Sequence, residues 1–398
     1  MEPGSDQWRD EQRRDILAFA RRSRRDAGGF AWLDNDGGFD PDADLQLWIT
    51  ARMTYVFALA HLGGDDDALD LAEHGVRALT TTFHDDVNGG WYAEVRADGK
   101  PAQTGKFCYE HAFVLLAACA AKAAGAEGAD ALLDEATTVH RTRFWDSGAG
   151  RCREEWNEDW TVLDGYRGAN SNMHSVEAYL FAADVTGDAV WRSRALAICE
   201  RLIGLHARAH DWRIPEHYDH DWTPIPNYNV EKPADPFRPF GATPGHAFEW
   251  ARLLTQLAAS LDEPAPWMQE AAEELFSRAV DDAVDDDSPG IPYTTDWYGS
   301  PVVEERFHWV IAEAVLAAHA LSASTGEAIY DGFARRWWAE TDEYFVTGTG
   351  WIHELSPTMG PSARTWQGKP DAYHAFNAVT LPSLPLAPSP AQTIERLT

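Results

Sequence analysis

The sequence predicts an all-α protein, an (α/α)6 barrel that carries short β-hairpins at one rim. Two observations predict this fold. A short motif rich in glycine and aromatic residues occurs six times, and each motif is followed by an apolar helical segment. Most of the apolar segments are followed in turn by a second, more amphipathic segment. Repeats of one supersecondary unit at a regular interval are typical of such architectures. Six units of a hairpin and two helices would give twelve helices.

The six motifs are regularly spaced. They are GGFAWLD, GGWYAEV, GRCREEW, DWRIPEHYD, GIPYTTDWYG and GWIHELS, beginning at Gly28, Gly89, Gly150, Asp211, Gly290 and Gly350. Successive motifs begin 61, 61, 61, 79 and 60 residues apart. Each motif alternates polar with aromatic or apolar residues over a few positions and is bounded by glycine or aspartate. This pattern is typical of a short strand or hairpin. The regular interval favours a single domain over residues 1–398, and the longer fourth interval predicts a long loop before the fourth apolar helix.

The apolar helices are expected to form the inside of the barrel. They cover residues 49–62, 109–123, 172–185, 245–259, 307–321 and 373–384. These segments have little polar surface on any side, whereas segments such as 68–83 and 189–209 are amphipathic and would form an outer ring. Pro244 predicts the start of the fourth apolar helix, because proline suits the first turn. The N-terminal helix, around residues 13–24, is expected to complete the last repeat.

Charge and cysteine usage exclude several classes of function. The net charge of −31 would repel nucleic acid and anionic membrane surfaces, so we expect neither as a partner. The longest apolar run, residues 112–121, is shorter than the roughly 20 residues of a membrane helix. The N-terminus lacks the apolar core of a secretion signal. Cys108, Cys119, Cys152 and Cys199 show no CxxC or zinc spacing, which favours a reducing compartment and a cytoplasmic protein.

Five of the six apolar helices carry a histidine near their start, and the remaining one offers Arg52 with Tyr55. The histidines are His111, His174, His246, His308 and His374. Equivalent positions converge on the axis of a barrel, so we expect these imidazoles to line one cavity with Arg52, Glu177, Arg238 and Glu249. A structural role explains any single histidine well. Five at one rim indicate a site, because a core does not require so many polar aromatic rings.

Three chemistries suit this set. His174 with Glu177 and His246 with Glu249 each place two possible metal ligands on one helix face, although no HExxH motif is present. Glycoside hydrolysis requires two carboxylates about 5–10 Å apart, which Glu177 and Glu249 could supply, but it leaves the histidines unexplained. Proton transfer next to a sugar carbonyl uses histidine as the base, arginine for the hydroxyls and aromatic rings for the sugar faces. We favour this third chemistry.

Three long segments resemble the N-acylglucosamine 2-epimerase superfamily, and within it the branch of the D-mannose and sulfoquinovose isomerases. They are YRGANSNMHSVEAYL, DPFRPFGATPGHAFEWARLL and GKPDAYHAFNA. The similarity extends over nearly the whole chain, from WITARMTYVFAL to YHAFNA. The resemblance implies an (α/α)6 barrel and an aldose–ketose isomerase or 2-epimerase that uses neither a metal nor a cofactor.

The resemblance also implies a role for each site residue. His246 and His374 would be the catalytic pair, with His374 moving the proton between C2 and C1 of open-chain mannose through a cis-enediol. His246 would assist ring opening, and Glu249 is expected to orient it. The implied substrate-binding residues are Arg52, Tyr109, Asn172, His174, Glu177, Arg238, Glu249 and Trp309.

The sequence leaves more than one reaction open. The favoured reaction is the interconversion of D-mannose and D-fructose, with D-lyxose and D-xylulose as a further pair. A sugar 2-epimerase of the mannose/glucose or cellobiose type would use the same two histidines. A sulfoquinovose isomerase and a sugar-binding barrel without catalysis also stay open. We expect a monosaccharide as the partner, and a monomer or homodimer as the assembly.

Overall fold

The computed structural model describes residues 1–398 except 286–287, 349 and 398. The chain divides into two compact units. Unit 1 comprises Met1–Ala18, Cys199–Gly368 and His374–Ala387. Unit 2 comprises Phe19–Ile198, Lys369–Tyr373 and Pro388–Thr398. A single domain over the whole chain stays a prediction.

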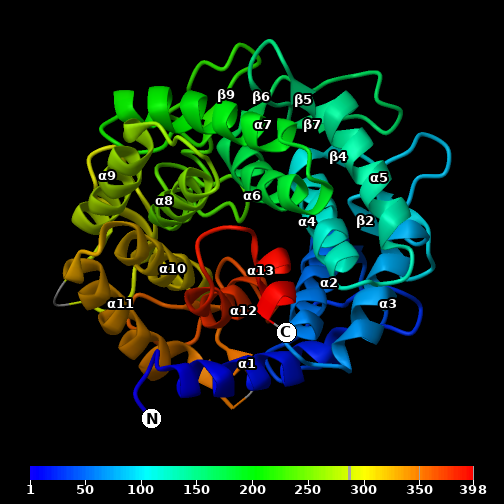
Figure 1. The fold of residues 1–398 in the computed structure, drawn as a ribbon, viewed down its shortest axis with the longest axis horizontal. Helices are drawn as coiled ribbons and strands as arrows, with labels where there is room; N and C mark the ends of the chain where they lie inside the picture. Colours follow the sequence, from blue (N-terminus) through cyan, green and yellow to red (C-terminus); the bar gives the residue numbers. More distant parts are fainter. Residues whose placement is uncertain (286–287, 349, 398) are drawn as a thin grey trace. The chain divides into compact units, whose positions relative to one another are not determined.

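Unit 2 contains three helix pairs. Its apolar helices are α2 (Leu47–Leu62), α4 (Cys108–Ala123) and α6 (Ala169–Thr186). Its amphipathic helices are α3 (Ala68–Thr80), α5 (Ala129–Val139) and α7 (Val190–Cys199), and a π-helical turn (His140–Phe144) follows α5. The helix α4 packs between α2 and α6, while α3 packs on α2 and α5 on α4 (Figure 1). The apolar helices are buried on almost every side, which confirms their predicted place in the core.

Unit 1 contains the other three pairs. Its apolar helices are α8 (Pro244–Ala259), α10 (His308–Thr325) and α12 (Tyr373–Thr380), the last beginning at the unit boundary. Its amphipathic helices are α9 (Pro266–Ala283), α11 (Ala328–Glu340) and most of α1 (Asp6–Ala20), with π-helical turns at Glu200–Ala207 and Thr341–Phe345. The helix α8 packs on α9 and α10, and α10 packs on α11. Among the described residues, no helix has the length and apolar character needed to cross a membrane.

The helix α1 completes the last repeat, as predicted, although it begins at Asp6 and therefore earlier than expected. Trp8 lies edge-on to Trp338 of α11, with ring centroids 5.2 Å apart. The Arg9 guanidinium donates to the Ser383 hydroxyl at 3.0 Å, just beyond the end of α12.

The strands are short and antiparallel. In unit 2, β1 (Leu45–Gln46), β2 (Glu94–Val95) and β3 (Pro101–Gln103) form one sheet, β4 (Lys106–Phe107) pairs with β7 (Glu155–Trp156), and β5 (Trp145–Asp146) with β6 (Arg151–Cys152). In unit 1, β10 (Pro292–Thr295), β11 (Pro301–Phe307) and β14 (Glu354–Leu355) form a sheet, and β12 (Val346–Thr347) pairs with β13 (Gly350–Trp351). The remaining strands are β8 (Arg167–Gly168) and β9 (His217–Tyr218). The motif at Gly28 differs from the predicted hairpin, because it contributes only isolated bridges.

One helix position fastens the preceding motif in each repeat of unit 2. The fourth residue of each apolar helix accepts the backbone N–H of a motif residue 20 positions earlier. The pairs are Phe30 with Thr50 Oγ1 at 3.2 Å, Trp91 with His111 Nε2 at 3.3 Å and Cys152 with Asn172 Oδ1 at 2.7 Å. Donors and acceptors both recur every 61 residues. The 61-residue repeat therefore extends from the chain path to individual hydrogen bonds.

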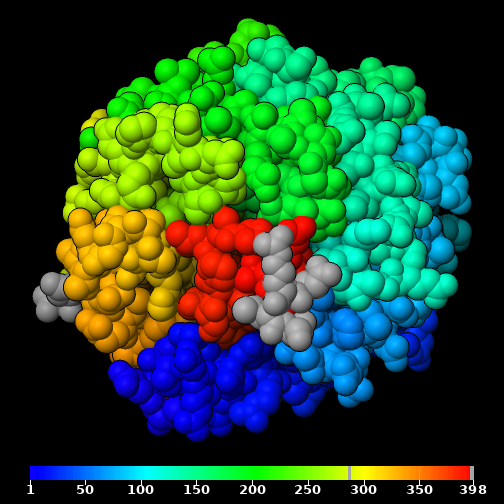
Figure 2. Space-filling view, viewed as in Figure 1, coloured from blue at the N-terminus to red at the C-terminus, as the bar shows by residue number. Residues whose placement is uncertain are grey.

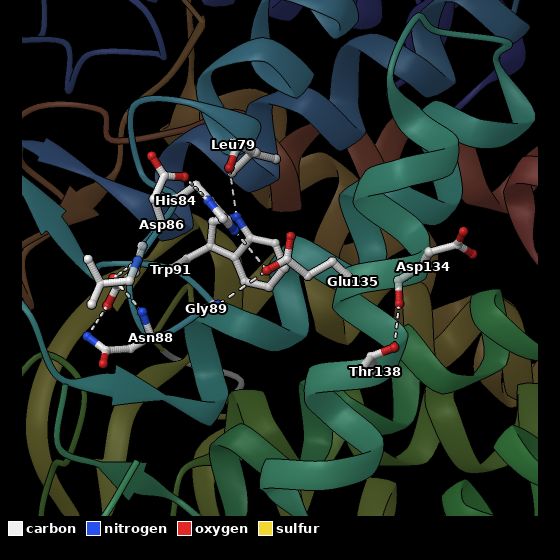
Figure 3. A network of polar contacts seen from close by, with 12 residues as sticks. Leu79, His84, Asp86, Asn88, Gly89, Trp91, Asp134, Glu135 and Thr138 are labelled. Carbon is white, nitrogen blue, oxygen red and sulfur yellow. Dashed lines mark hydrogen bonds and ion pairs between the residues drawn. The ribbon is translucent and has the colours of Figure 1, made fainter. Parts of the chain in front are cut away.

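A bridging histidine joins the second motif to α5 (Figure 3). His84 contacts Asp86 through Nδ1 at 2.7 Å and Glu135 of α5 through Nε2 at 2.8 Å. Next to it, the Trp91 indole donates to the carbonyl of Leu79 at the end of α3 at 2.7 Å. Burial lowers the pKa of His84, but the two carboxylates outweigh it and leave that pKa raised.

A C-terminal helix, α13 (Pro390–Leu397), was not predicted. It packs on α2, α4 and α6 within unit 2. The backbone N–H of Ser389 donates to the Asp184 carboxylate at 2.6 Å, and Ala391 is fully buried. The C-terminal segment appears in red on the face shown in the space-filling view (Figure 2).

Candidate active site

Two histidines of unit 1 are each held by a buried carboxylate. His246 is the third residue of α8, and its Nδ1 lies 2.9 Å from Glu216 Oε1. His374 is the second residue of α12, and its Nδ1 lies 2.9 Å from Glu313 Oε1. An ionised carboxylate only accepts, so Nδ1 of each ring must be the donor. The neutral tautomer then has its acceptor lone pair on Nε2, which is the arrangement of a histidine that exchanges protons with a ligand.

A single tryptophan contacts both imidazoles. The indole of Trp309 has its ring centroid 5.3 Å from that of His246 and 5.6 Å from that of His374. Gly245 permits this approach, because a Cβ at that position would lie only 2.5 Å from the Trp309 indole. Both histidines are 7% exposed, so they are enclosed without being sealed from solvent. A small residue at the start of α8 and a large one at the start of α10 thus bring the two bases to one side chain.

A buried arginine organises the carboxylates around His374. Arg252 Nε donates to Glu313 Oε2 at 2.9 Å, and Arg252 Nη2 donates to Glu249 Oε1 at 3.3 Å. Glu249, Glu313 and His374 have potential ligand atoms within 4.8 Å of one another, a spacing that would suit a metal ion. Arg252 already pairs with both carboxylates and supplies the positive charge that they require. The geometry therefore favours an ion-pair cluster.

The carboxylate that orients His246 differs from the predicted one. We expected Glu249, because residues three apart on a helix face the same side. Glu216 makes that contact instead, and Glu249 pairs with Arg252 three residues further along α8. The sequence reasoning missed Glu216, Arg252 and Glu313. The repeat could have indicated Glu313, because Glu313 has the same position in its helix as the predicted Glu249. Each is the sixth residue, Glu313 in α10 and Glu249 in α8.

In unit 2, Arg52 is enclosed by aromatic rings. Its Nη1 donates to Asp371 at 3.1 Å and its Nη2 to the Tyr109 hydroxyl at 2.9 Å. The guanidinium carbon lies 4.2 Å from the ring centroid of Phe113 and 4.8 Å from that of Tyr373. Burial lowers the pKa of Arg52, but Tyr109 and Asp371 outweigh it and raise that pKa overall. The arginine therefore stays charged although it is buried.

His174 and Glu177 lie close to this arginine cluster. His174 Nδ1 is 3.9 Å from the Glu177 carboxylate, and the His174 ring contacts Tyr109 and Phe113. Glu177 also accepts a hydrogen bond from the Tyr373 hydroxyl. Unit 2 thus gathers Arg52, Tyr109, His174 and Glu177 from the predicted set. The sequence reasoning missed Asp371 and Tyr373.

Asn172 and His111 differ from the other site candidates, because their polar atoms bond to the backbone. Besides accepting from Cys152, Asn172 donates through Nδ2 to the carbonyl of Gly168 at 2.9 Å, and it is fully buried. His111 Nδ1 bonds to the carbonyl of Phe107 at 2.7 Å while Nε2 accepts from Trp91. Burial lowers the pKa of His111.

The five histidines also differ in helix register, contrary to expectation. In chain order they are the fourth, sixth, third, first and second residues of their helices. Nδ1 of His308 lies 3.3 Å from the backbone carbonyl of His353, and Nδ1 of His111 also contacts a backbone carbonyl. His246 and His374 share a different arrangement, with a carboxylate oxygen 2.9 Å from Nδ1. The five histidines therefore differ both in helix position and in the partner of Nδ1.

The long loop predicted before α8 carries Arg238. Asp235 accepts the Arg238 backbone N–H at 2.8 Å, and the Arg238 carbonyl accepts from Asn229 at 2.7 Å. Burial lowers the pKa of His217 and outweighs the hydrogen bond to the Pro239 carbonyl and the charge of Glu216, which both raise it. His217 Nε2 lies 2.7 Å from the carbonyl of Pro239, the residue after Arg238, and His217 directly follows Glu216, so the loop holds Arg238 near the Glu216–His246 pair.

Comparisons with known proteins match nearly the whole chain. The sequence profile described as N-acylglucosamine 2-epimerase matches residues 28–378. D-mannose isomerase of Thermobifida fusca is 46% identical over 96% of this chain and 95% of the relative. D-mannose isomerase of Pseudomonas cannabina pv. alisalensis is 44% identical over 99% of this chain and 96% of the relative.

A crystal structure of D-mannose isomerase matches with a TM-score of 0.89 and 27% identity, covering 95% of this chain and 98% of the other. The structure of cellobiose 2-epimerase from Spirochaeta thermophila matches with a TM-score of 0.83 at 23% identity, which bears on the fold alone. The predicted all-α (α/α)6 fold class is confirmed. The profile match and the two full-length relatives show that the chain belongs to the N-acylglucosamine 2-epimerase family.

Proposed function

We propose that this protein is an aldose–ketose isomerase that interconverts D-mannose and D-fructose, with His246 and His374 as its acid–base pair. The observation that carries the proposal is the pair of imidazoles against Trp309, each oriented through Nδ1 by its own carboxylate. The full-length similarity to D-mannose isomerases supports the choice of sugar.

The reaction requires one proton to move between neighbouring carbons. His374 takes the C2 proton of the open-chain aldose, the electrons of the C2–H bond form the C1–C2 double bond, and O1 gains a proton. The cis-enediol that results then loses its O2 proton, while His374 delivers to C1 the proton that it took from C2. These two transfers give the ketose. His246 protonates and deprotonates the sugar oxygens, including O5 during ring opening. Arg238 and Arg52 are the proposed stabilisers of charge on O1 and O2.

The proposed substrate-binding set is smaller than the predicted one. We retain Arg52, Tyr109, His174, Glu177, Arg238, Glu249 and Trp309. Asn172 is removed, because its amide is used by the backbone. Trp309 would offer the sugar an apolar face next to both bases.

The test is to incubate the purified protein with D-mannose and separate the products by liquid chromatography, with and without EDTA. We expect fructose in both cases, and deuterium incorporation when the reaction runs in D2O. Glucose as the main product would establish a 2-epimerase instead. Equilibrium binding of aldoses without any product would indicate a sugar-binding protein, and loss of activity in EDTA would contradict a reaction without metal.

We also propose that the enzyme acts in the cytoplasm, without a nucleic-acid partner, as a monomer or homodimer. The four cysteines are free and buried, as is usual where thiols stay reduced. The net charge of −31 supports the absence of nucleic acid. Size-exclusion chromatography with light scattering will measure the assembly, and a mass above two chains of 44.3 kDa would contradict it.

A further inference from the structure

Two buried carboxylates lie next to His374. Glu249 is 1% exposed and Glu313 is fully buried. Potential ligand atoms of these two residues and of His374 all lie within 4.8 Å of one another. Two negative charges so close together, away from water, strongly favour the uptake of a proton nearby. Without a compensating cation, either a carboxylate or the imidazole of His374 would hold that proton.

Arg252 is placed to compensate both charges. It donates through Nε to Glu313 Oε2, while His374 bonds to Oε1 of the same carboxylate, each at 2.9 Å. Its Nη2 reaches Glu249 at 3.3 Å, and its Nη1 reaches Gln256 at 3.3 Å. Arg252 is 2% exposed, so solvent screens these contacts little. Its charge acts on His374 through Glu313.

In the part of the chain that the structure describes, three helices supply charged or titratable groups next to His374. Glu313 belongs to α10, Glu249 and Arg252 to α8, and Tyr373 precedes His374 on α12.

His246, the other histidine that contacts Trp309, is held by a different carboxylate. Its Nδ1 partner is Glu216, which precedes α8, and Glu249 follows His246 three residues later on that helix. Arg252 donates directly to Glu313, the carboxylate that holds His374. Arg252 should therefore act more strongly on His374 than on His246.

We propose that Arg252 is a positioning residue that keeps His374 in its neutral form, by neutralising the carboxylates of Glu249 and Glu313. The inference rests on the proposed function, because it explains how His374 can begin the reaction as the base. An imidazole that already carries two protons cannot accept the C2 proton. Glu313 can then orient the ring while Arg252 prevents the carboxylates from locking it as an imidazolium.

The test is an NMR titration of protein labelled with [13Cε1]-histidine, in the absence of sugar. A His374→Gln variant assigns the His374 signal. Arg252→Gln should raise the titration midpoint of His374 by about one pH unit or more, and should move that of His246 less. Glu249→Gln should lower the His374 midpoint. The acidic limb of kcat/KM for D-mannose should move in the same direction as the midpoint in each variant.

Gln256→Ala is the matched control, because it removes a contact of Arg252 that involves neither carboxylate. It should leave the His374 midpoint unchanged, and a shift as large as that of Arg252→Gln would overturn the proposal. A midpoint that stays or falls in Arg252→Gln, or stays or rises in Glu249→Gln, would also overturn it.

If Arg252→Gln does not fold by circular dichroism, the sign of the shift in Glu249→Gln decides. The double variant Glu249→Gln/Arg252→Gln, which has one carboxylate next to His374, is a second test. Its His374 midpoint should lie near that of the wild type. The midpoints are measured without sugar, so their outcome is independent of whether the protein isomerises mannose.

Discussion

The contact between Glu216 and His246 gives a quantitative prediction. Glu216→Gln keeps the shape of the side chain and removes its charge from a hydrogen bond of 2.9 Å in which Glu216 is 4% exposed. Hydrogen bonds to charged groups contribute about 1.5–3 kcal/mol, and a tenfold rate change corresponds to about 1.4 kcal/mol. If the bond strengthens as His246 takes up a proton, kcat should fall about 10- to 150-fold.

The assay is steady-state conversion of D-mannose, with fructose quantified by chromatography. KM should change less than kcat, because Glu216 acts on the base and not on the sugar. Glu305→Gln is the matched control, because Glu305 is 3% exposed and pairs with Arg364 at 2.7 Å rather than with a catalytic histidine. It should keep kcat within about threefold of the wild type. A Glu216→Gln variant with an unchanged kcat, or a Glu305→Gln variant with an equal loss, would refute the reasoning.

Three further outcomes are expected. His246→Ala and His374→Ala should each reduce turnover by about 10²–10⁴-fold while circular dichroism stays unchanged, and activity within tenfold of the wild type would remove that residue from the mechanism. Asn172→Ala should unfold at a lower temperature, because it leaves buried backbone groups unpaired at about 1–3 kcal/mol each, yet the folded variant should keep its KM for mannose; a raised KM would return Asn172 to the binding set. The raised pKa of His84 means that its two ion pairs stabilise the folded state below pH 6.5, and that this contribution disappears as pH rises through the higher folded value. His84→Gln should therefore lower the melting temperature more at pH 5.5 than at pH 9, and an equal deficit at both would contradict the linkage.

The helices could be predicted from the repeat, because a helix that is buried on almost every side consists mostly of apolar residues. The six apolar segments and the start of α8 at Pro244 follow the prediction, while α12 ends at Thr380, before the predicted residue 384. The helix α13 was missed because its sequence lies outside the repeat. Its stability depends on packing against three helices that are distant in sequence.

The site was less predictable than the helices, because its pairs join separate segments. The prediction that Glu249 orients His246 relied on local helix geometry, yet the actual partner, Glu216, is 30 residues earlier. Superposing the repeats at an interval of 61 residues would have corrected another expectation. That interval places His111 with Asn172 and Thr50, as an anchor of its motif, and groups Arg52 with His174.

The hydrogen bond that Thr50, His111 and Asn172 each accept from the preceding motif affects how the sequences of such proteins can vary. Each apolar helix of unit 2 holds its own upstream turn with one side chain, so the segment between the donor and the acceptor of that bond is fixed at both ends. Exchanging such a segment for the matching one of a relative should leave the helices in place, provided that the bond is kept. Natural variation and protein engineering can therefore change these segments without changing the helical framework.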